Sequence, residues 1–277
     1  MKQIIENWWK IILISLFGVI VWGFFRSFIF RKIIFVMDPA DIIAYGDSIL
    51  FTNGIFLPVL TVIGIIVLLF YSIFYVLLKE GIAGNKYIKG LFYGVSFAII
   101  YFIAIMEFYH FFNGNFIDGV FGGIADGVSL LITGIILGIF IPAKEENKSS
   151  RPMKYLLSIL FIAVIFTIGR IFFYSYIYST PLIKQLNSYI YLSVYGAAFG
   201  IAYYYLSQGI KTNNYYYKSI LFGLIQSPII ISGNMFICLR YQFPLMPVII
   251  ISIIDIMAII AGGLLTEFVF FPSHKKI

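Results

Sequence analysis

Charged residues are scarce in this sequence, and their scarcity excludes a soluble globular protein. Asp, Glu, Lys and Arg together make up 11% of the 277 residues, whereas hydrophobic residues make up 61%. The mean hydropathy is +1.00. A globular domain in water needs more polar side chains than this to cover its surface. The composition therefore predicts an integral membrane protein.

Cysteine is nearly absent, and so are the sequence motifs of common enzymes. Because Cys238 is the single cysteine, an intramolecular disulfide and a cysteine metal cluster are both excluded. The chain contains no HExxH zinc motif, no GxSxG nucleophile elbow, no Walker A loop and no dinucleotide-binding fingerprint. We therefore expect no cofactor, no metal site and no catalytic residues of these classes. An enzyme is the less favoured interpretation.

Long apolar runs are what the sequence has in abundance. Eight segments each carry the roughly 20 mostly apolar residues that a membrane-spanning helix needs. The runs are apolar on every side and do not alternate as the strands of a membrane barrel do, so helices are predicted. The segments are residues 11–30, 55–78, 91–112, 120–141, 155–178, 189–208, 219–237 and 248–271.

The sequence is also repeated internally. Arg26 follows Lys10 by 16 residues, and Arg170 follows Lys154 by the same interval. An internal repeat defines the architectural unit of a fold, and the unit here contains four of the eight segments. The matched positions are Leu13 and Leu157, Leu16 and Leu160, Phe17 and Phe161, Phe28 and Phe172, Asn85 and Asn214, Tyr87 and Tyr216, Lys89 and Lys218, Gly94 and Gly223, Asp126 and Asp255, and Gly134 and Gly263.

The predicted fold is an all-α membrane protein with about eight transmembrane helices, built as two parallel four-helix repeats. Four helices per copy mean that both copies enter the membrane in the same direction, so an axis along the membrane normal relates them. Residues 1–142 form the first half, residues 143–154 a hydrophilic cytoplasmic linker, and residues 155–277 the second half.

The distribution of Lys and Arg predicts the orientation. Most of these residues lie in the termini, in the linker and in the loops on the same side, and that side is cytoplasmic by the positive-inside rule. We therefore expect a multi-pass protein of a prokaryotic-type plasma membrane with both termini in the cytoplasm. The net charge of +7 is explained by contacts with anionic membrane lipids, and no nucleic-acid partner is expected.

Five ionisable residues of the apolar segments are expected at one depth, in the outer half of the bundle. A charged side chain at membrane depth costs at least about 2.5–3.5 kcal/mol unless it is paired, snorkels to the interface or meets water. Equal depth therefore favours pairing of arginines with carboxylates. The candidates are Arg26, Glu107, Asp126, Arg170 and Asp255.

His110 completes the candidate polar site. It lies three residues after Glu107 and hence on the same helix face. The matching positions of the second half hold Phe236 and Leu239, so only the first half carries this pair of an acid and a base. A Glu and a His at an aqueous mouth can relay protons or bind a cation, but a merely hydrated interfacial pair is more common.

Several other positions have both a functional and a structural interpretation. Asp38, Asp41 and Asp47 can gate a mouth or hold a cation, although a solvated external loop is favoured. Polar residues of the seventh segment are compatible with a cavity wall, whereas small residues of the fourth and eighth segments indicate close helix packing. The former are Gln226, Pro228 and Asn234, and the latter are Gly134, Gly138, Ala258, Gly262 and Gly263.

Two functions from different classes therefore remain open. The first is a transporter or permease for a small solute or ion, with a polar site in the outer half of the bundle. The second is an accessory or assembly subunit in which the Arg and Asp pairs are structural clamps. An intramembrane enzyme acting on lipid is a third possibility, with Glu107 and His110 as its acid and base. The expected partners are membrane lipids and an unknown small solute or ion.

Overall fold

The protein is all-helical in the part of the chain that the structure describes. The computed structural model describes residues 2–33, 48–111, 116–143, 156–177, 186–210, 212, 214–240 and 244–270. The long helices are α1 (Lys2–Ile33), α3 (Phe56–Leu78), α4 (Lys86–Phe111), α5 (Phe116–Phe140), α6 (Leu157–Phe172), α7 (Leu186–Leu206), α8 (Tyr215–Arg240) and α9 (Leu245–Phe270). Three short elements accompany them within these ranges: α2 (Ile49–Thr52), the π-helical turn η3 (Phe173–Ile177) and the 3₁₀ turn η5 (Ser207–Gly209).

Each of the eight predicted segments coincides with one long helix. Most predicted ends fall within a few residues of the observed ones, but α1 begins at Lys2, well before the predicted start at residue 11. Within the described residues, six helices are long and apolar enough to cross a membrane. Helices α7 and α8 are not among these six, and α8 carries the polar residues Lys218, Gln226 and Asn234.

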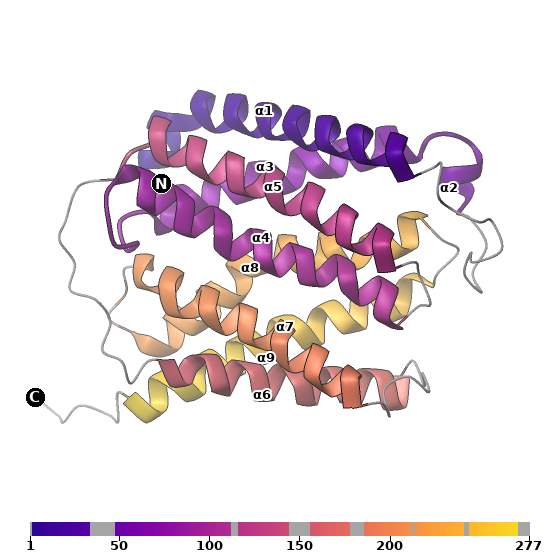
Figure 1. The fold of residues 1–277 in the computed structure, drawn as a ribbon. Helices are drawn as coiled ribbons and strands as arrows, with labels where there is room; N and C mark the ends of the chain where they lie inside the picture. Colours follow the sequence, from indigo (N-terminus) through magenta and orange to yellow (C-terminus); the bar gives the residue numbers. More distant parts are fainter. Residues whose placement is uncertain are drawn as a thin grey trace, which may run out of the picture.

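The helices run side by side along the length of the molecule (Figure 1). The helices of residues 2–140 form its upper part in this view, and those of residues 157–270 form its lower part. Helix α1 begins and helix α9 ends at the same end of the bundle (Figure 1). In each part a similar packing occurs, since α4 packs on α5 and α1 on α5, as α8 packs on α9 and α6 on α9.

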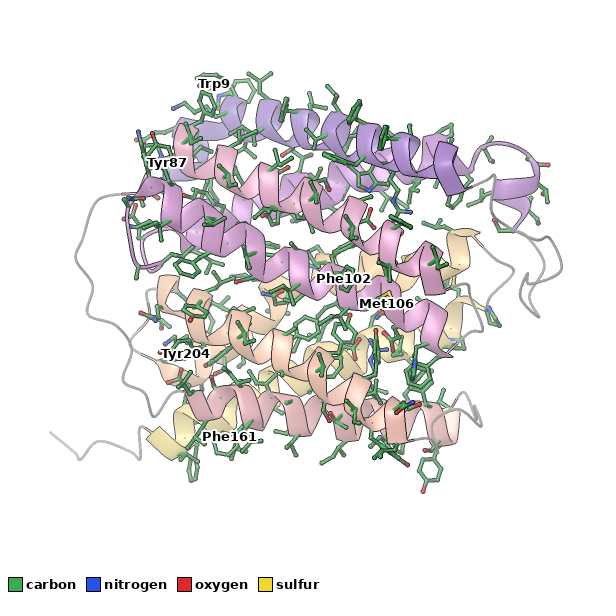
Figure 2. The ribbon with its side chains drawn as sticks, viewed as in Figure 1. Trp9, Tyr87, Phe102, Met106, Phe161 and Tyr204 are labelled. Atoms are coloured by element: carbon green, nitrogen blue, oxygen red, sulfur yellow. The ribbon has the colours of Figure 1, made fainter. Side chains whose placement is uncertain are left out.

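The core joins the two parts of the bundle. Buried aromatic side chains of α3 and α4 pack with one another, such as Tyr71 against Phe97 with ring centres 5.2 Å apart. The same buried cluster includes Phe166 of α6 and Phe199 of α7. Large apolar side chains also cover the outside of the bundle, where Trp9 projects from α1 (Figure 2). An apolar exterior of this extent is what contact with lipid chains requires.

Small residues allow the close approach of α4 and α5, as their spacing indicates. A Cβ atom added to Gly90 would lie 2.5 Å from the carbonyl oxygen of Gly134 and 3.0 Å from Cα of Gly138. In the other part of the bundle, a Cβ on Gly262 would lie 2.8 Å from Cα of Ile162 on α6. Packing therefore accounts for these glycines.

Some predicted features lie outside the described residues. These are Asp38, Asp41 and Asp47 of the predicted external loop and nearly all of the linker at residues 143–154.

Candidate functional site

The first ion pair joins α1 to α5. The Nε atom of Arg26 donates to Oδ1 of Asp126 at 2.8 Å, and its Nη2 atom donates to Oδ2 at 2.5 Å. The indole Nε1 of Trp22 also donates to Oδ1 of Asp126, at 2.7 Å. Trp22 and Arg26 are one turn apart on α1, so their side chains share a face. Three donors therefore hold one buried carboxylate.

A glycine of α5 close to this ion pair allows α4 to approach. A Cβ atom on Gly122 would lie 3.8 Å from Nη1 of Arg26, and one on Gly123 would lie 2.7 Å from the ring of Phe102 on α4. Ser129, three residues after Asp126, donates its hydroxyl to the Asp126 carbonyl oxygen at 2.7 Å. The glycine at position 123 thus lets α4 pack closely on α5 one turn before Asp126.

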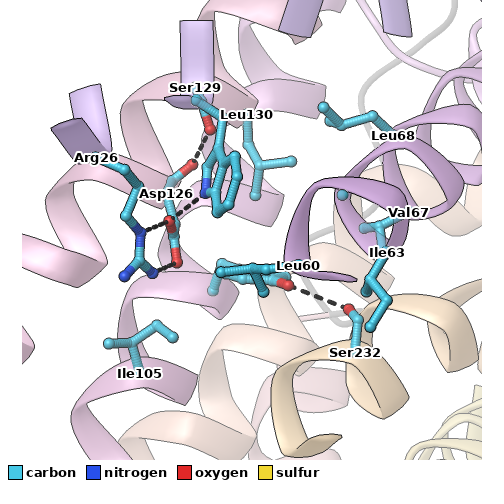
Figure 3. Close-up of a pocket in the computed structure, with 13 residues that line it drawn as sticks. Arg26, Leu60, Ile63, Val67, Leu68, Ile105, Asp126, Ser129, Leu130 and Ser232 are labelled. Carbon is cyan, nitrogen blue, oxygen red and sulfur yellow. Dashed lines mark hydrogen bonds and ion pairs between the residues drawn. The ribbon is translucent and has the colours of Figure 1, made fainter. Parts of the chain in front are cut away.

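A cavity of about 60 Å³ lies beside this ion pair (Figure 3). Its walls come from α1, α3, α4 and α5 and, in the other part of the bundle, from Ser232 of α8. Tyr101 and Ser232 both line the cavity, and their hydroxyl oxygens are 3.1 Å apart. The other lining residues are Trp22, Arg26, Leu60, Ile63, Gly64, Val67, Leu68, Ile105, Asp126, Ser129 and Leu130.

The second ion pair joins α6 to α9 with the same atoms. The Nε atom of Arg170 donates to Oδ1 of Asp255 at 2.6 Å, and its Nη2 atom donates to Oδ2 at 2.5 Å. Both side chains are fully buried. The guanidinium also lies over the rings of Phe166 and Tyr195, 5.2 and 5.4 Å from their centres. Each of these two arginines is therefore paired with the aspartate of its own half.

Glu107 connects the second pair to α4. The Nη1 atom of Arg170 donates to Oε1 of Glu107, and the Tyr174 hydroxyl donates to the same oxygen at 2.6 Å. Tyr174 lies in the π-helical turn that follows α6, and such turns frequently occur at functional sites. The amide of Asn234 donates to Oδ2 of Asp255 at 3.3 Å. Arg170, Glu107, Asp255, Tyr174 and Asn234 are called the Arg170 cluster below.

His110 lies apart from this network. Its Nε2 atom is 3.2 Å from the Ser188 hydroxyl, and its ring stacks on that of Tyr191 with centres 5.0 Å apart. Among the described residues, neither hydrogen bond on Glu107 involves His110. The six predicted site residues thus occupy three places: the cavity wall with Arg26 and Asp126, the Arg170 cluster, and the contact of His110 with α7.

Polar residues of α8 differ in their roles. Gln226 is buried, and neither of its amide atoms has a hydrogen-bond partner in the described part of the chain. The Ser227 hydroxyl donates to the carbonyl oxygen of Leu224, the acceptor that Pro228 cannot use. Neither Gln226 nor Pro228 lines the cavity beside Arg26, whereas Ser232 of the same helix does.

Sequence reasoning missed two residues that complete these clusters, Trp22 and Tyr174. Each lies four positions from the arginine of its own segment, Trp22 before Arg26 and Tyr174 after Arg170. Residues four apart on a helix are neighbours, so this spacing was a usable signal. Within the described residues, no group of three or more His, Cys, Asp or Glu side chains is arranged to hold a metal ion.

Comparisons with protein-family models, with curated proteins and with solved structures find no match for this chain.

Proposed function

We propose that this protein is a multi-pass membrane transporter or permease for a small solute or ion, with its substrate site in the cavity beside Arg26 and Asp126. The observation that carries the proposal is a cavity in the first part of the bundle that has a buried ion pair in its wall and is also lined by Ser232 of the second part. Transporters with internal repeats bind their substrates at the interface of the repeats, where movement of one repeat against the other changes access.

The composition of the cavity wall supports this role. Most of the wall is apolar, while Arg26, Asp126, Tyr101, Ser129 and Ser232 supply a few polar groups. Binding sites for small molecules combine an apolar surface with a few placed polar groups that orient the ligand. A water molecule needs roughly 10–15 Å³ of such space, so the cavity suits several waters, a hydrated ion or a very small solute.

The proposal includes eight membrane spans in two parallel halves, residues 1–142 and 155–277. Three observations support it: the two Arg and Asp pairs use the same atoms, the helix contacts of the halves correspond, and the more polar helices α7 and α8 lie among other helices (Figure 1). Helices that are largely covered by neighbours can carry polar residues at membrane depth, because those residues find partners inside the protein.

We also propose that both termini are cytoplasmic, in a prokaryotic-type plasma membrane. A cysteine at Ser149 in the linker is then expected to be shielded from an impermeant thiol reagent in intact cells, whereas one at Asn115 is expected to react. Labelling is measured in a Cys238→Ser background, because Cys238 is the single native thiol. Reaction at Ser149 in sealed cells, with Asn115 protected, would reverse the orientation.

The rival function is an accessory or assembly subunit. The Arg170 cluster favours it, because Arg170 and Asp255 are fully buried and bonded to each other. A closed cluster of this kind clamps helices and needs no solute. The two functions differ in what they require of the cavity, since transport needs it open to a ligand and clamping does not.

The test fills the cavity without disturbing the backbone. A Cβ atom on Gly64 or on Gly23 would meet nothing within 4 Å, but Gly64 lines the cavity and Gly23 does not. Gly64→Leu is therefore expected to reduce flux to the rate of empty liposomes, while Gly23→Leu keeps the wild-type rate. Flux is measured in proteoliposomes with sodium, potassium, protons, glycerol and urea as probes.

The matched pair of glycines controls for folding. Leucine improves helix propensity equally at both positions, by about 1 kcal/mol, so both variants are expected to fold. Equal flux in Gly64→Leu and wild type would show that the cavity carries no substrate. Absence of flux for every probe in the wild-type protein would favour the accessory subunit.

A further inference from the structure

The Arg170 cluster contains more acid than base. One guanidinium, that of Arg170, faces two carboxyl groups, those of Asp255 and Glu107. The exposed fractions of these residues are 0% for Arg170, 0% for Asp255 and 3% for Glu107. In the described part of the chain, Arg170 is the only cation that pairs with either carboxyl group. Two ionised carboxylates would therefore leave one uncompensated negative charge in a buried site.

The hydrogen bonds distinguish the two carboxyl groups. Both oxygens of Asp255 accept hydrogen bonds from Arg170, and Oδ2 also accepts one from Asn234. Glu107 receives its two donors, Nη1 of Arg170 and the hydroxyl of Tyr174, on the single oxygen Oε1. A bidentate pair with a guanidinium is the arrangement of an ionised carboxylate. A protonated acid instead accepts on its carbonyl oxygen and keeps the other oxygen for the O–H group.

We propose that the Arg170 cluster is a proton-binding site, with one exchangeable proton on Oε2 of Glu107. In this state Oε1 is the carbonyl oxygen that accepts from Arg170 and Tyr174, and the cluster is neutral. An isolated buried charge is so costly that a titratable group gives it up by taking a proton. Release breaks the O–H bond of Glu107, transfers the proton to water and leaves a carboxylate, so the cluster then carries one negative charge.

The neighbouring ionisable groups do not supply a second positive charge. The Tyr174 hydroxyl donates to Glu107, the Tyr191 hydroxyl donates to the carbonyl oxygen of Ile103, and the Tyr195 ring lies beside Arg170, so each of these tyrosines is an uncharged neighbour. Among the described residues, His110 of α4 contacts Ser188 and forms no ion pair with Glu107, and Asp255 of α9 is already paired with Arg170 of α6. The pair of Arg26 and Asp126 balances itself. Glu107 is therefore the group whose proton neutralises the cluster.

Proton release is expected to weaken the contact between the two parts of the bundle. Glu107 belongs to α4, whereas Arg170 and Asp255 belong to α6 and α9, so a second negative charge adds repulsion between Glu107 and Asp255 across this contact. The site stands whether or not the cavity carries a solute. If the proposed transport function holds, the proton is its coupling ion.

The experiment detects the protonated carboxyl group by infrared spectroscopy, a measurement that needs no transport activity. We expect the wild-type protein in detergent at neutral pH to show a carbonyl band of a protonated carboxyl group that shifts in D₂O. This band is expected to disappear completely in Glu107→Gln and to remain in the control Asp126→Asn. Glutamine has the shape of the neutral acid and accepts the same two hydrogen bonds, so Glu107→Gln is expected to fold as the wild type does.

Each other outcome would overturn the proposal. A wild-type spectrum without the band means that both carboxyl groups are ionised. A band that persists in Glu107→Gln places the proton elsewhere, and its loss in Asp255→Asn would identify Asp255. Failure of Glu107→Gln to fold would also overturn the proposal, because a neutral isostere cannot damage a site that is already neutral there.

Discussion

Arg170→Gln is expected to remove most of the folded protein, with a loss of about 3–5 kcal/mol. Arg170 is fully buried and bonded to Asp255 of its own half and to Glu107 of the other half. Glutamine is too short to reach both acids and carries no charge, so Asp255 remains buried without its cation. Folded yield in detergent, measured by size-exclusion chromatography, and the midpoint of thermal unfolding report the loss.

The matched control is Arg26→Gln. Arg26 lies beside the cavity, where water can solvate Asp126 after the change, so a smaller loss is expected. Asp255→Asn added to Arg170→Gln is expected to restore part of the yield, because it removes the charge that Arg170→Gln leaves unpaired. Double-mutant cycles are expected to show coupling between Arg170 and Asp255 and none between Arg26 and Asp255. Additive losses in every combination would mean that the arginines act independently.

Gly81→Ala is expected to disrupt the packing of the two parts of the bundle at the end where α1 begins. A Cβ atom on Gly81 would lie 1.9 Å from the backbone nitrogen of Gly209 and 2.1 Å from its Cα. Backbone atoms cannot turn aside as a side chain does, so the segments after α3 and α7 must separate. Overpacking of a core costs about 1–3 kcal/mol of stability. Because the added Cβ overlaps with backbone atoms, we expect Gly81→Ala to lose stability at the upper end of this range or beyond it.

Thermal unfolding in detergent tests this expectation, with Gly209→Ala as the reciprocal change. Its Cβ atom would lie 2.2 Å from the carbonyl oxygen of Leu78, so the two variants are expected to lose similar stability. Gly23→Ala, whose Cβ meets nothing within 4 Å, is the control and is expected to unfold no earlier than the wild type, because alanine also improves helix propensity there. Wild-type stability in Gly81→Ala would show that the two segments are not in contact.

The sequence predicted the helices well because helix length in a membrane is set by apolar length. Helix α3 differs from the predicted segment by one residue at its start and ends where predicted, at Leu78. The repeat and the estimate of depth placed the arginines and aspartates at one depth, but they left open whether each arginine pairs with the aspartate of its own half or of the other half. The structure pairs Arg26 with Asp126 and Arg170 with Asp255, each within its own half.

The remaining contacts depend on how helices rotate and pack, which no spacing in the sequence encodes. The bond from Arg170 to Glu107 joins segments of different halves, and Glu107 has no counterpart in the repeat. For this reason the sequence grouped Glu107 with His110 and not with Arg170. The cavity could not be predicted for the same reason, because Ser232 reaches it only through the packing of α8 on the first half.

The most direct test of the proposed function is the reaction of a cysteine at Ser232 with a small hydrophilic thiol reagent in a Cys238→Ser background. If the cavity beside Arg26 and Asp126 is a substrate site, water and the reagent must reach its wall. Ser232→Cys is therefore expected to react in the folded protein, with Gly64→Leu abolishing the reaction and Gly23→Leu leaving it unchanged. A cysteine that reacts only after denaturation would mean that the cavity is sealed, and it would contradict transport through this site.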